Sequence, residues 1–162
     1  MKAKQNELKQ QYEADPKSAL LHLYAEGTVD FERFAFHMEH PSSEGDLGMH
    51  PASGGDGSFR CPVEIMLAGW IGCFGVTLAA VASSMRLKIE SCAIKATGLL
   101  DFKGTLAVDR DSPVGLLDLK LNVQIASQEP AESLEKLIEL SERYCVVHQT
   151  LASPPKLEIE RC

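Results

Sequence analysis

Hydrophobic residues are concentrated in one long central stretch of the chain. From Ile65 to Met85 no residue carries a formal charge, and the stretch lies between Glu64 and Arg86. Proline suits the first turn of a helix, because its missing N–H would have no partner there. Glu64, an acidic residue in the same turn, complements the helix dipole. The pattern therefore predicts a helix from Pro62 to Met85.

A stretch of this kind suits either a membrane span or a helix in a protein core. About 20 apolar residues are enough to cross a bilayer. Glycines and hydroxyl residues dilute the hydrophobicity of this stretch: Gly69, Gly72, Gly75, Thr77, Ser83 and Ser84. The alternating segments that follow it are typical of a soluble domain. We therefore expect a core helix surrounded by protein, and no membrane partner.

Alternation of apolar and polar residues predicts several strands. The most regular segment is 116–125, in which Leu117, Leu119, Leu121, Val123 and Ile125 share one face. Residues 89–98 and 100–109 are also predicted strands. Residues 28–40 alternate with a one-residue slip, which predicts a strand with a bulge, and 155–161 is a short strand-like end. Such strands form an antiparallel sheet with one solvated face.

Two further helical segments complete the predicted α+β fold. Residues 130–147 carry an apolar stripe at helical spacing: Leu134, Leu137, Ile138, Ser141 and Cys145. Residues 5–14 predict a short polar helix, which makes 1–26 an N-terminal helical extension. A chain of 162 residues corresponds to a single domain, 1–162. The fold class is therefore α+β, with an antiparallel sheet and two main helices.

The amino-acid composition limits the binding partners and the cellular compartment that we expect for this protein. The net charge is −7 and no cluster of Lys and Arg is present, which disfavours nucleic acid as a partner. The five cysteines are an odd number, so they cannot all pair within the chain. The polar N-terminus has no apolar segment that could act as a secretory signal. We expect a cytoplasmic protein with reduced thiols.

The cysteines are the candidate reactive groups. Cys73 lies among small residues of the central helix, and Cys145 lies on the apolar stripe of the second helix; each alone is compatible with simple packing. Cys61 precedes a helix N-terminus, where the dipole would stabilise its thiolate. We expect Cys92 in the core and Cys162 at a frayed end. No paired spacing of metal ligands is present, so neither a metal nor a bound cofactor is expected.

Two segments resemble the OsmC/Ohr superfamily of thiol peroxidases. The string "PVEIMLAGWIGCFGVTLAA", from Pro62 to Ala80, resembles the family helix that opens with a proline and an acid and then carries a cysteine. The later "LIELSERYCVVHQTL" resembles its second motif, a helix that ends in Cys-Pro-Val. The resemblance implies an OsmC-like fold, an intertwined homodimer with sites at the subunit interface, and reduction of organic hydroperoxides with an external dithiol reductant.

The resemblance also assigns roles to residues. Cys73 matches the peroxidatic cysteine and Cys145 the resolving one, so a sulfenic acid on the first would condense with the second to a disulfide. Glu64 matches the family's acid, displaced by one position because Val63 follows the proline. Nine residues before Cys73, it would face the opposite side of a regular helix, so the alternative to a role in the site is a first-turn residue that complements the helix dipole.

The family's activating arginine corresponds to Arg33. Burial of a thiol disfavours its thiolate, so the chemistry requires a cation or hydrogen-bond donor near it. Arg33 could also be an ordinary exposed strand residue, and Arg60 is a substitute by its proximity to the helix. "CVV" in place of "CPV" removes a helix-ending proline without affecting the thiol.

Two other functions compete with a peroxidase. One is a non-catalytic protein of the same fold, which binds an apolar ligand in the interface pocket. The other is a single-span membrane protein.

Overall fold

The computed structural model describes residues 27–30, 35–38, 45–105 and 110–157 of the chain. The chain divides into two compact units, 1–46 and 47–162. The predicted helix at 5–14, the N-terminal extension and Arg33 lie outside the described residues.

The first unit contains two short strands where the sequence predicted one. Strand β1 (Gly27–Asp30) pairs antiparallel with β2 (Ala35–Met38), and Thr28 lies opposite His37. The single bulged strand predicted over 28–40 is therefore wrong. The irregularity in the alternation of apolar residues lies between the end of β1 and the start of β2, so it reflects two separate strands.

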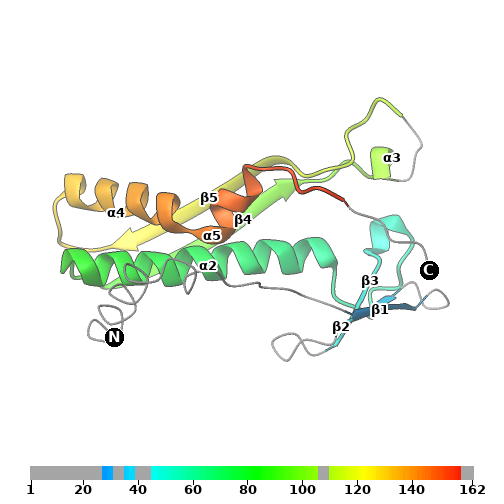
Figure 1. Cartoon of the computed structure of the whole chain (residues 1–162), viewed down its shortest axis with the longest axis horizontal. Coiled ribbons are helices and arrows are strands. Elements are labelled where there is room, and N and C mark those ends of the chain that lie inside the picture. Colours follow the sequence, from blue (N-terminus) through cyan, green and yellow to red (C-terminus); the bar gives the residue numbers. More distant parts are fainter. Residues whose placement is uncertain (1–26, 31–34, 39–44, 106–109, 158–162) are drawn as a thin grey trace, which may run out of the picture. The chain divides into compact units, whose positions relative to one another are not determined.

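Helix α2 (Pro62–Met85) is the longest element of the second unit and has the predicted bounds (Figure 1). Cys61 is its N-cap residue, Pro62 begins the first turn, and Glu64 lies in that turn. The helix ends because Arg86 adopts a left-handed conformation with φ 60°. The N–H of Arg86 then bonds to the carbonyls at the end of the helix, which satisfies acceptors that would otherwise have no partner.

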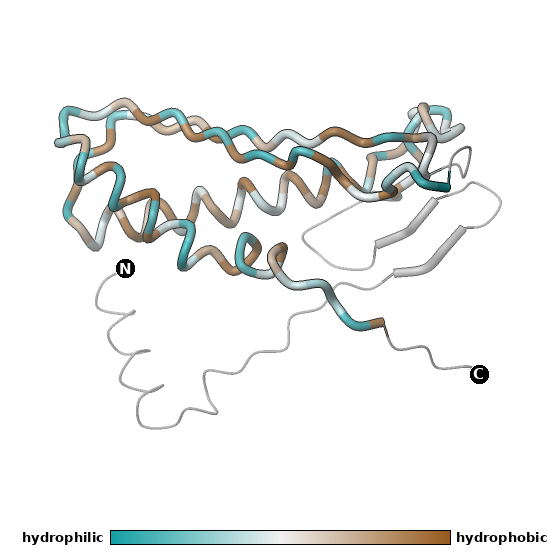
Figure 2. Tube along the Cα trace, turned by 90° about the horizontal axis from the view of Figure 1, so that it is seen from above, coloured by the Kyte–Doolittle hydropathy of each residue, from teal (hydrophilic) through white to brown (hydrophobic). Residues whose placement is uncertain are grey.

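Strands β4 (Ser91–Leu99) and β5 (Leu117–Ala126) form an antiparallel pair, with Ile94 opposite Val123. Along β5 half-buried and exposed residues alternate without a break, which confirms the predicted pattern. Figure 2 shows hydrophobic and hydrophilic residues interspersed along the paired strands.

The strand predicted over 100–109 is wrong within the described residues, because Phe102–Thr105 is the short helix α3. The Phe102 ring stacks on His50 at 5.4 Å. A side chain at Gly104 would collide with the backbone of Pro113. Contacts distant in sequence therefore override the local alternation. Strand β3 (Asp46–Gly48) and the 3-10 helix η2 (Pro51–Ser53) precede α2, and 155–157 at the other end form no strand.

The second predicted helix is two helices, α4 (Ala131–Tyr144) and α5 (Val146–Leu151). The helix predicted to run through 130–147 is wrong at Cys145, where the backbone is extended at ψ 110°. Cys145 ends α4 with an N–H bond to the Ser141 carbonyl, and its own carbonyl accepts from Gln149 in α5. The residue is therefore held on both sides of the break.

The core of the second unit lies where α2, α4 and the apolar face of the sheet meet (Figure 1). Its buried members are Phe74, Leu78, Ala82, Leu137 and Cys145. Apolar residues of both strands pack against this cluster: Ile94, Leu121, Val123 and Ile125.

The opposite face of α2 is not covered by the residues of the second unit that the structure describes. Val76 on that face is 74% exposed, so the expectation of a helix surrounded by protein fails for the single chain. By length and composition α2 is the one helix, among the described residues, that could cross a membrane. A core helix of a soluble protein meets the same criterion.

Leu137 provides a test of this core, since its side chain is fully buried. We expect Leu137→Ala to lower the free energy of unfolding by about 2–5 kcal/mol, because it removes buried methyl groups and leaves a cavity. Urea denaturation followed by circular dichroism measures the change. The control is Glu135→Ala, an exposed position of the same helix, which should change stability by no more than about 0.5 kcal/mol. Equal effects of the two variants would contradict the packing.

Candidate functional site

Two cysteines distant in sequence meet in the core of the second unit. Cys73 lies in the middle of α2 and packs against the buried cluster, while Cys145 belongs to that cluster and is 0% exposed. Cys73 is partly exposed, and both thiols are free. The Cys73 thiol is close enough to Cys145 to act on the pKa of its thiol. The structure therefore brings together the two residues that the sequence predicted as a pair.

Burial raises the pKa of the Cys145 thiol above its usual range. The Cys73 thiol raises that pKa further, through a hydrogen bond to the neutral thiol and through charge repulsion. The backbone N–H groups of His148 and Val147 act in the opposite direction, since they stabilise a thiolate. The net effect favours the protonated form of Cys145.

This arrangement can support a dithiol–disulfide couple. Two thiols in contact can close a disulfide without a large movement of the backbone. A molecule that arrives from solvent can reach Cys73, whereas Cys145 is enclosed. The geometry therefore gives the two sulfurs different access to an oxidant.

Three rings form a wall beside the cysteines. The imidazole of His148 in α5 lies 5.7 Å from the ring of Trp70 and 6.4 Å from that of Phe74, measured between centroids. Trp70 and Phe74 are both buried residues of α2 and flank Cys73 in sequence. Cys73 therefore lies on the same helix as two buried aromatic residues and packs against an apolar cluster that includes Phe74.

Two ring nitrogens in this wall are buried without a hydrogen-bond partner among the described residues: Trp70 Nε1 and His148 Nδ1. Native proteins pair the great majority of buried polar atoms. We therefore expect both atoms to be satisfied by groups from outside this set. The other imidazole nitrogen, His148 Nε2, lies 3.3 Å from Glu142 Oε1.

The predicted activating residues are not seen beside the sulfurs. Glu64 is exposed in the first turn of α2, where it complements the helix dipole. Arg60 is also exposed, and its backbone pairs with β3 through Leu47. Arg33 lies outside the described residues. Within the described part of the chain, no cation contributes to the pKa shift of Cys145.

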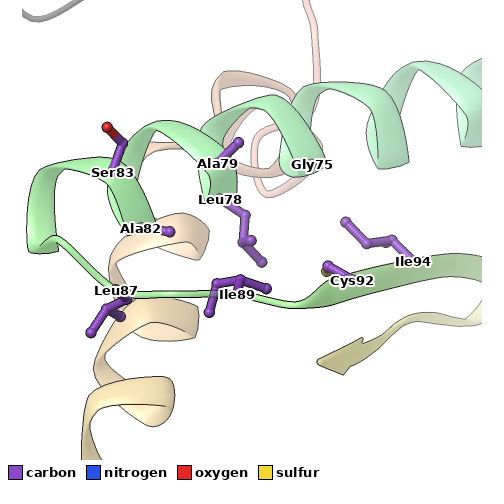
Figure 3. Close-up of a pocket in the computed structure, with 9 residues that line it drawn as sticks. All are labelled: Gly75, Leu78, Ala79, Ala82, Ser83, Leu87, Ile89, Cys92 and Ile94. Atoms are coloured by element: carbon purple, nitrogen blue, oxygen red, sulfur yellow. The ribbon is translucent and has the colours of Figure 1, made fainter. Parts of the chain in front are cut away.

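The other described cysteines lie apart from this pair. Cys61 is partly buried at the N-cap of α2. Cys92 is exposed, so its predicted place in the core is wrong. It lines a pocket of about 520 Å³ between α2 and β4, where partial desolvation raises the pKa of its thiol. Figure 3 shows apolar side chains such as Leu78 and Ile89 between the helix and the strand.

The pocket and the sulfur pair are separate features, because neither Cys73 nor Cys145 is among the residues that line it. No three His, Cys, Asp or Glu side chains of the described ranges are grouped so that they could hold a metal ion.

Sequence reasoning overlooked one residue of this site, His148. It follows Cys145 by three positions, which places the imidazole within α5, directly after the break. An indication in the sequence was a lone histidine within a mainly apolar segment that carries no acidic or basic residue besides it, "CVVHQTL".

Solved structures of other proteins share this fold. An OsmC-like protein from Mycoplasma pneumoniae is 17% identical, with a TM-score of 0.66 over 82% of this chain and 88% of that chain. An organic hydroperoxide resistance protein from Elizabethkingia anophelis is 20% identical, with a TM-score of 0.61 over 81% and 90%. A third, the organic hydroperoxide resistance protein OsmC from Legionella pneumophila, is 18% identical, with a TM-score of 0.57 over 82% and 91%.

These likenesses show the fold, and the comparison with curated proteins gave no match. The model of the family described as "OsmC-like protein" matches residues 55–160, a range that includes α2, the sheet and both cysteines of the pair. The chain is therefore a member of the OsmC-like protein family.

Proposed function

We propose that this protein is a thiol-dependent peroxidase that reduces organic hydroperoxides. The observation that carries the proposal is the contact between Cys73 and Cys145, two thiols that come from different helices and meet in one core. Cys73 is the nucleophile and Cys145 is the resolving thiol.

The proposed reaction has three balanced steps. The Cys73 thiolate attacks the O–O bond of the hydroperoxide, which releases an alkoxide that takes up a proton as the alcohol and leaves a sulfenic acid on Cys73. The Cys145 thiol then loses its proton and attacks that sulfur, which forms the disulfide and releases water. An external dithiol reduces the disulfide by exchange and becomes oxidised itself. No bound cofactor takes part.

The different exposure of the two thiols supports this order. Cys73 is partly exposed and can meet the peroxide, whereas Cys145 is fully buried and favours its protonated form. A thiol that remains protonated until its neighbour is oxidised does not compete for the peroxide, because the thiolate is the nucleophile. The raised pKa of Cys145 therefore suits the second step.

The substrate class follows from the surroundings of Cys73. The buried rings of Trp70 and Phe74 provide an apolar wall that suits the organic group of a hydroperoxide better than hydrogen peroxide. Two of the structurally similar proteins are named organic hydroperoxide resistance proteins. We place the reaction in the cytoplasm, where dithiol reductants are present.

We further propose that the cation and the acid of the site are Arg33 and Glu64. A positive charge beside Cys73 would favour its thiolate. Glu64 is exposed at the start of α2 in the single chain, so a contact with the site would require a neighbouring subunit.

The uncovered face of α2 supports a homodimer. Its exposed residues are small or apolar: Ala68, Gly69, Gly72, Val76 and Ala79. An added side chain at Gly69 or Gly72 would meet nothing within 4 Å in the single chain. The backbone is therefore accessible to close approach by another helix, and we propose that the second subunit covers this face.

A second candidate function is binding of an apolar ligand without catalysis. The pocket of about 520 Å³ between α2 and β4 favours it, because most of its lining residues are apolar. It is separate from the sulfur pair, so the two functions can be tested independently.

The peroxidase proposal predicts that the native chain consumes cumene hydroperoxide in the presence of a dithiol. Cys73→Ser should reduce turnover to the rate without protein, because the nucleophile is lost. Cys145→Ser should still be oxidised once at Cys73 but should form no disulfide within the chain. Loss of the hydroperoxide is measured colorimetrically.

Cys92→Ser is the matched control, because Cys92 lies outside the sulfur pair, and it should keep full turnover. Unchanged turnover in Cys73→Ser would overturn the proposal. In that case, binding of a fluorescent fatty acid by the unmodified chain would support the apolar-ligand function.

The raised pKa of Cys145 predicts a pH dependence for the second step. Below this pKa the thiolate fraction rises about tenfold for each pH unit, and the usual thiol pKa is about 8.5. The rate of disulfide formation after one equivalent of peroxide should therefore rise with pH from 6 to above 8.5 without levelling. Rapid mixing, acid quench and mass spectrometry measure it. A rate independent of pH over this range would exclude ionisation of Cys145 as the limiting event.

The dimer proposal predicts that Val76→Arg converts the protein to monomers, because it places a charge in the apolar contact. Sedimentation velocity measures the change. Val114→Arg is the control, since Val114 is also an exposed valine, at 61%, but lies in a loop. A native chain that sediments as a monomer, or that sediments only with membranes, would contradict the proposal.

A further inference from the structure

The position of the Cys145 sulfur depends on a short helix. Cys145 lies at the break between α4 and α5, and α5 has only six residues. A helix of this length is not stable by itself in water, because nucleation costs more than so few bonds return. Whatever holds α5 against the core therefore also fixes the resolving thiol.

His148 attaches α5 to the helix that carries Cys73. Its ring lies 5.7 Å from that of Trp70 and 6.4 Å from that of Phe74, both of them in α2. No residue of α5, all of which the structure describes, is fully buried, and Val147 is the other α5 residue that packs against the core. The imidazole therefore provides a main contact between the two helices.

The same imidazole also spans the break. Its Nε2 lies 3.3 Å from Glu142 Oε1, at the end of α4. Glu142 precedes Cys145 by three residues and His148 follows it by three, so this contact closes a bridge over the cysteine. The same two helices, α4 and α5, are also joined by a hydrogen bond, in which Gln149 Nε2 donates to the backbone carbonyl of Glu142 at 3.0 Å.

We propose that His148 is a positioning residue, which holds Cys145 beside Cys73 so that the sulfenic acid is resolved before a second peroxide arrives. The inference rests on the proposed peroxidase function. The carboxylate of Glu142 is more than half exposed, at 57%, so the bridge adds little to overall stability. Its effect is on the geometry of the second step.

Loss of this positioning would leave the first step intact. Cys73 would still become a sulfenic acid, but Cys145 would reach it more slowly. A second hydroperoxide would then oxidise the sulfenic acid to sulfinic acid, which a dithiol does not reduce. The expected signature is a fall in the disulfide yield together with a rise in sulfinic acid on Cys73.

Three substitutions separate the two contacts of His148. His148→Ala removes both, His148→Phe keeps a ring against Trp70 and Phe74 but loses the contact with Glu142, and His148→Gln keeps a polar side chain that can reach Glu142 but loses the ring. Thr150→Ala is the matched control, because Thr150 is an exposed residue of the same helix. Urea denaturation verifies that each variant is folded.

The experiment follows both steps after one equivalent of cumene hydroperoxide. We expect the rate of Cys73 oxidation in His148→Ala to match that of the native chain, while disulfide formation slows by about tenfold or more, as expected for a displaced reacting group. His148→Phe and His148→Gln should each recover part of the rate, and Thr150→Ala all of it. With excess peroxide, sulfinic acid should rise most in His148→Ala, less in His148→Phe and His148→Gln, and no more than in the native chain in Thr150→Ala.

The two proposals fail in different ways. If Cys73 reacts normally and the disulfide rate is unchanged in both His148→Ala and His148→Phe, the positioning role is wrong and the peroxidase proposal stands. If Cys73 of the native chain does not react with the hydroperoxide, the peroxidase proposal is wrong. Disulfide formation driven by diamide, which needs no peroxide, then decides the positioning role, because it should still slow in His148→Ala.

Discussion

The burial of one thiol against another is the interaction on which the site depends. Cys145 has no exposed surface, lies in the same apolar cluster as Phe74 and Leu137, and contacts the Cys73 thiol. Removal from water makes the neutral form of Cys145 the stable one. The same packing that stabilises the core of the second unit therefore favours the protonated form of Cys145 and encloses it, while Cys73 stays partly exposed.

The two faces of helix α2 differ in their packing. One face carries Trp70, Phe74 and Leu78 into the core, and it presents Cys73 to the break between α4 and α5. The other face is exposed and consists of small and apolar residues, which suits contact with a second copy of the chain. The strong hydrophobicity of the sequence over Pro62–Met85 serves the core on one face and, under the proposed dimer, the second subunit on the other.

Elements with a strong local signal were predictable from the sequence. The bounds of α2 follow from Pro62 and the absence of charge up to Met85, and the alternation of β5 is regular. The break at Cys145 was not predictable, because no proline or glycine marks it and the apolar stripe of α4 continues through it. The helix α3 was missed because the contact between Phe102 and His50 links positions far apart in sequence. The pairing of Cys73 with Cys145 came from the family resemblance, since spacing alone does not place two helices side by side. His148 was missed because its contacts depend on the break.

The most direct test of this account is the equilibrium between the Cys73–Cys145 disulfide and glutathione. It is measured in a chain with Cys61→Ser, Cys92→Ser and Cys162→Ser, both folded and in urea. If the fold holds the two thiols in contact, their effective concentration in the folded chain should exceed that in urea by about a hundredfold or more. The same effective concentration in both states would mean that the fold does not bring the two sulfurs together.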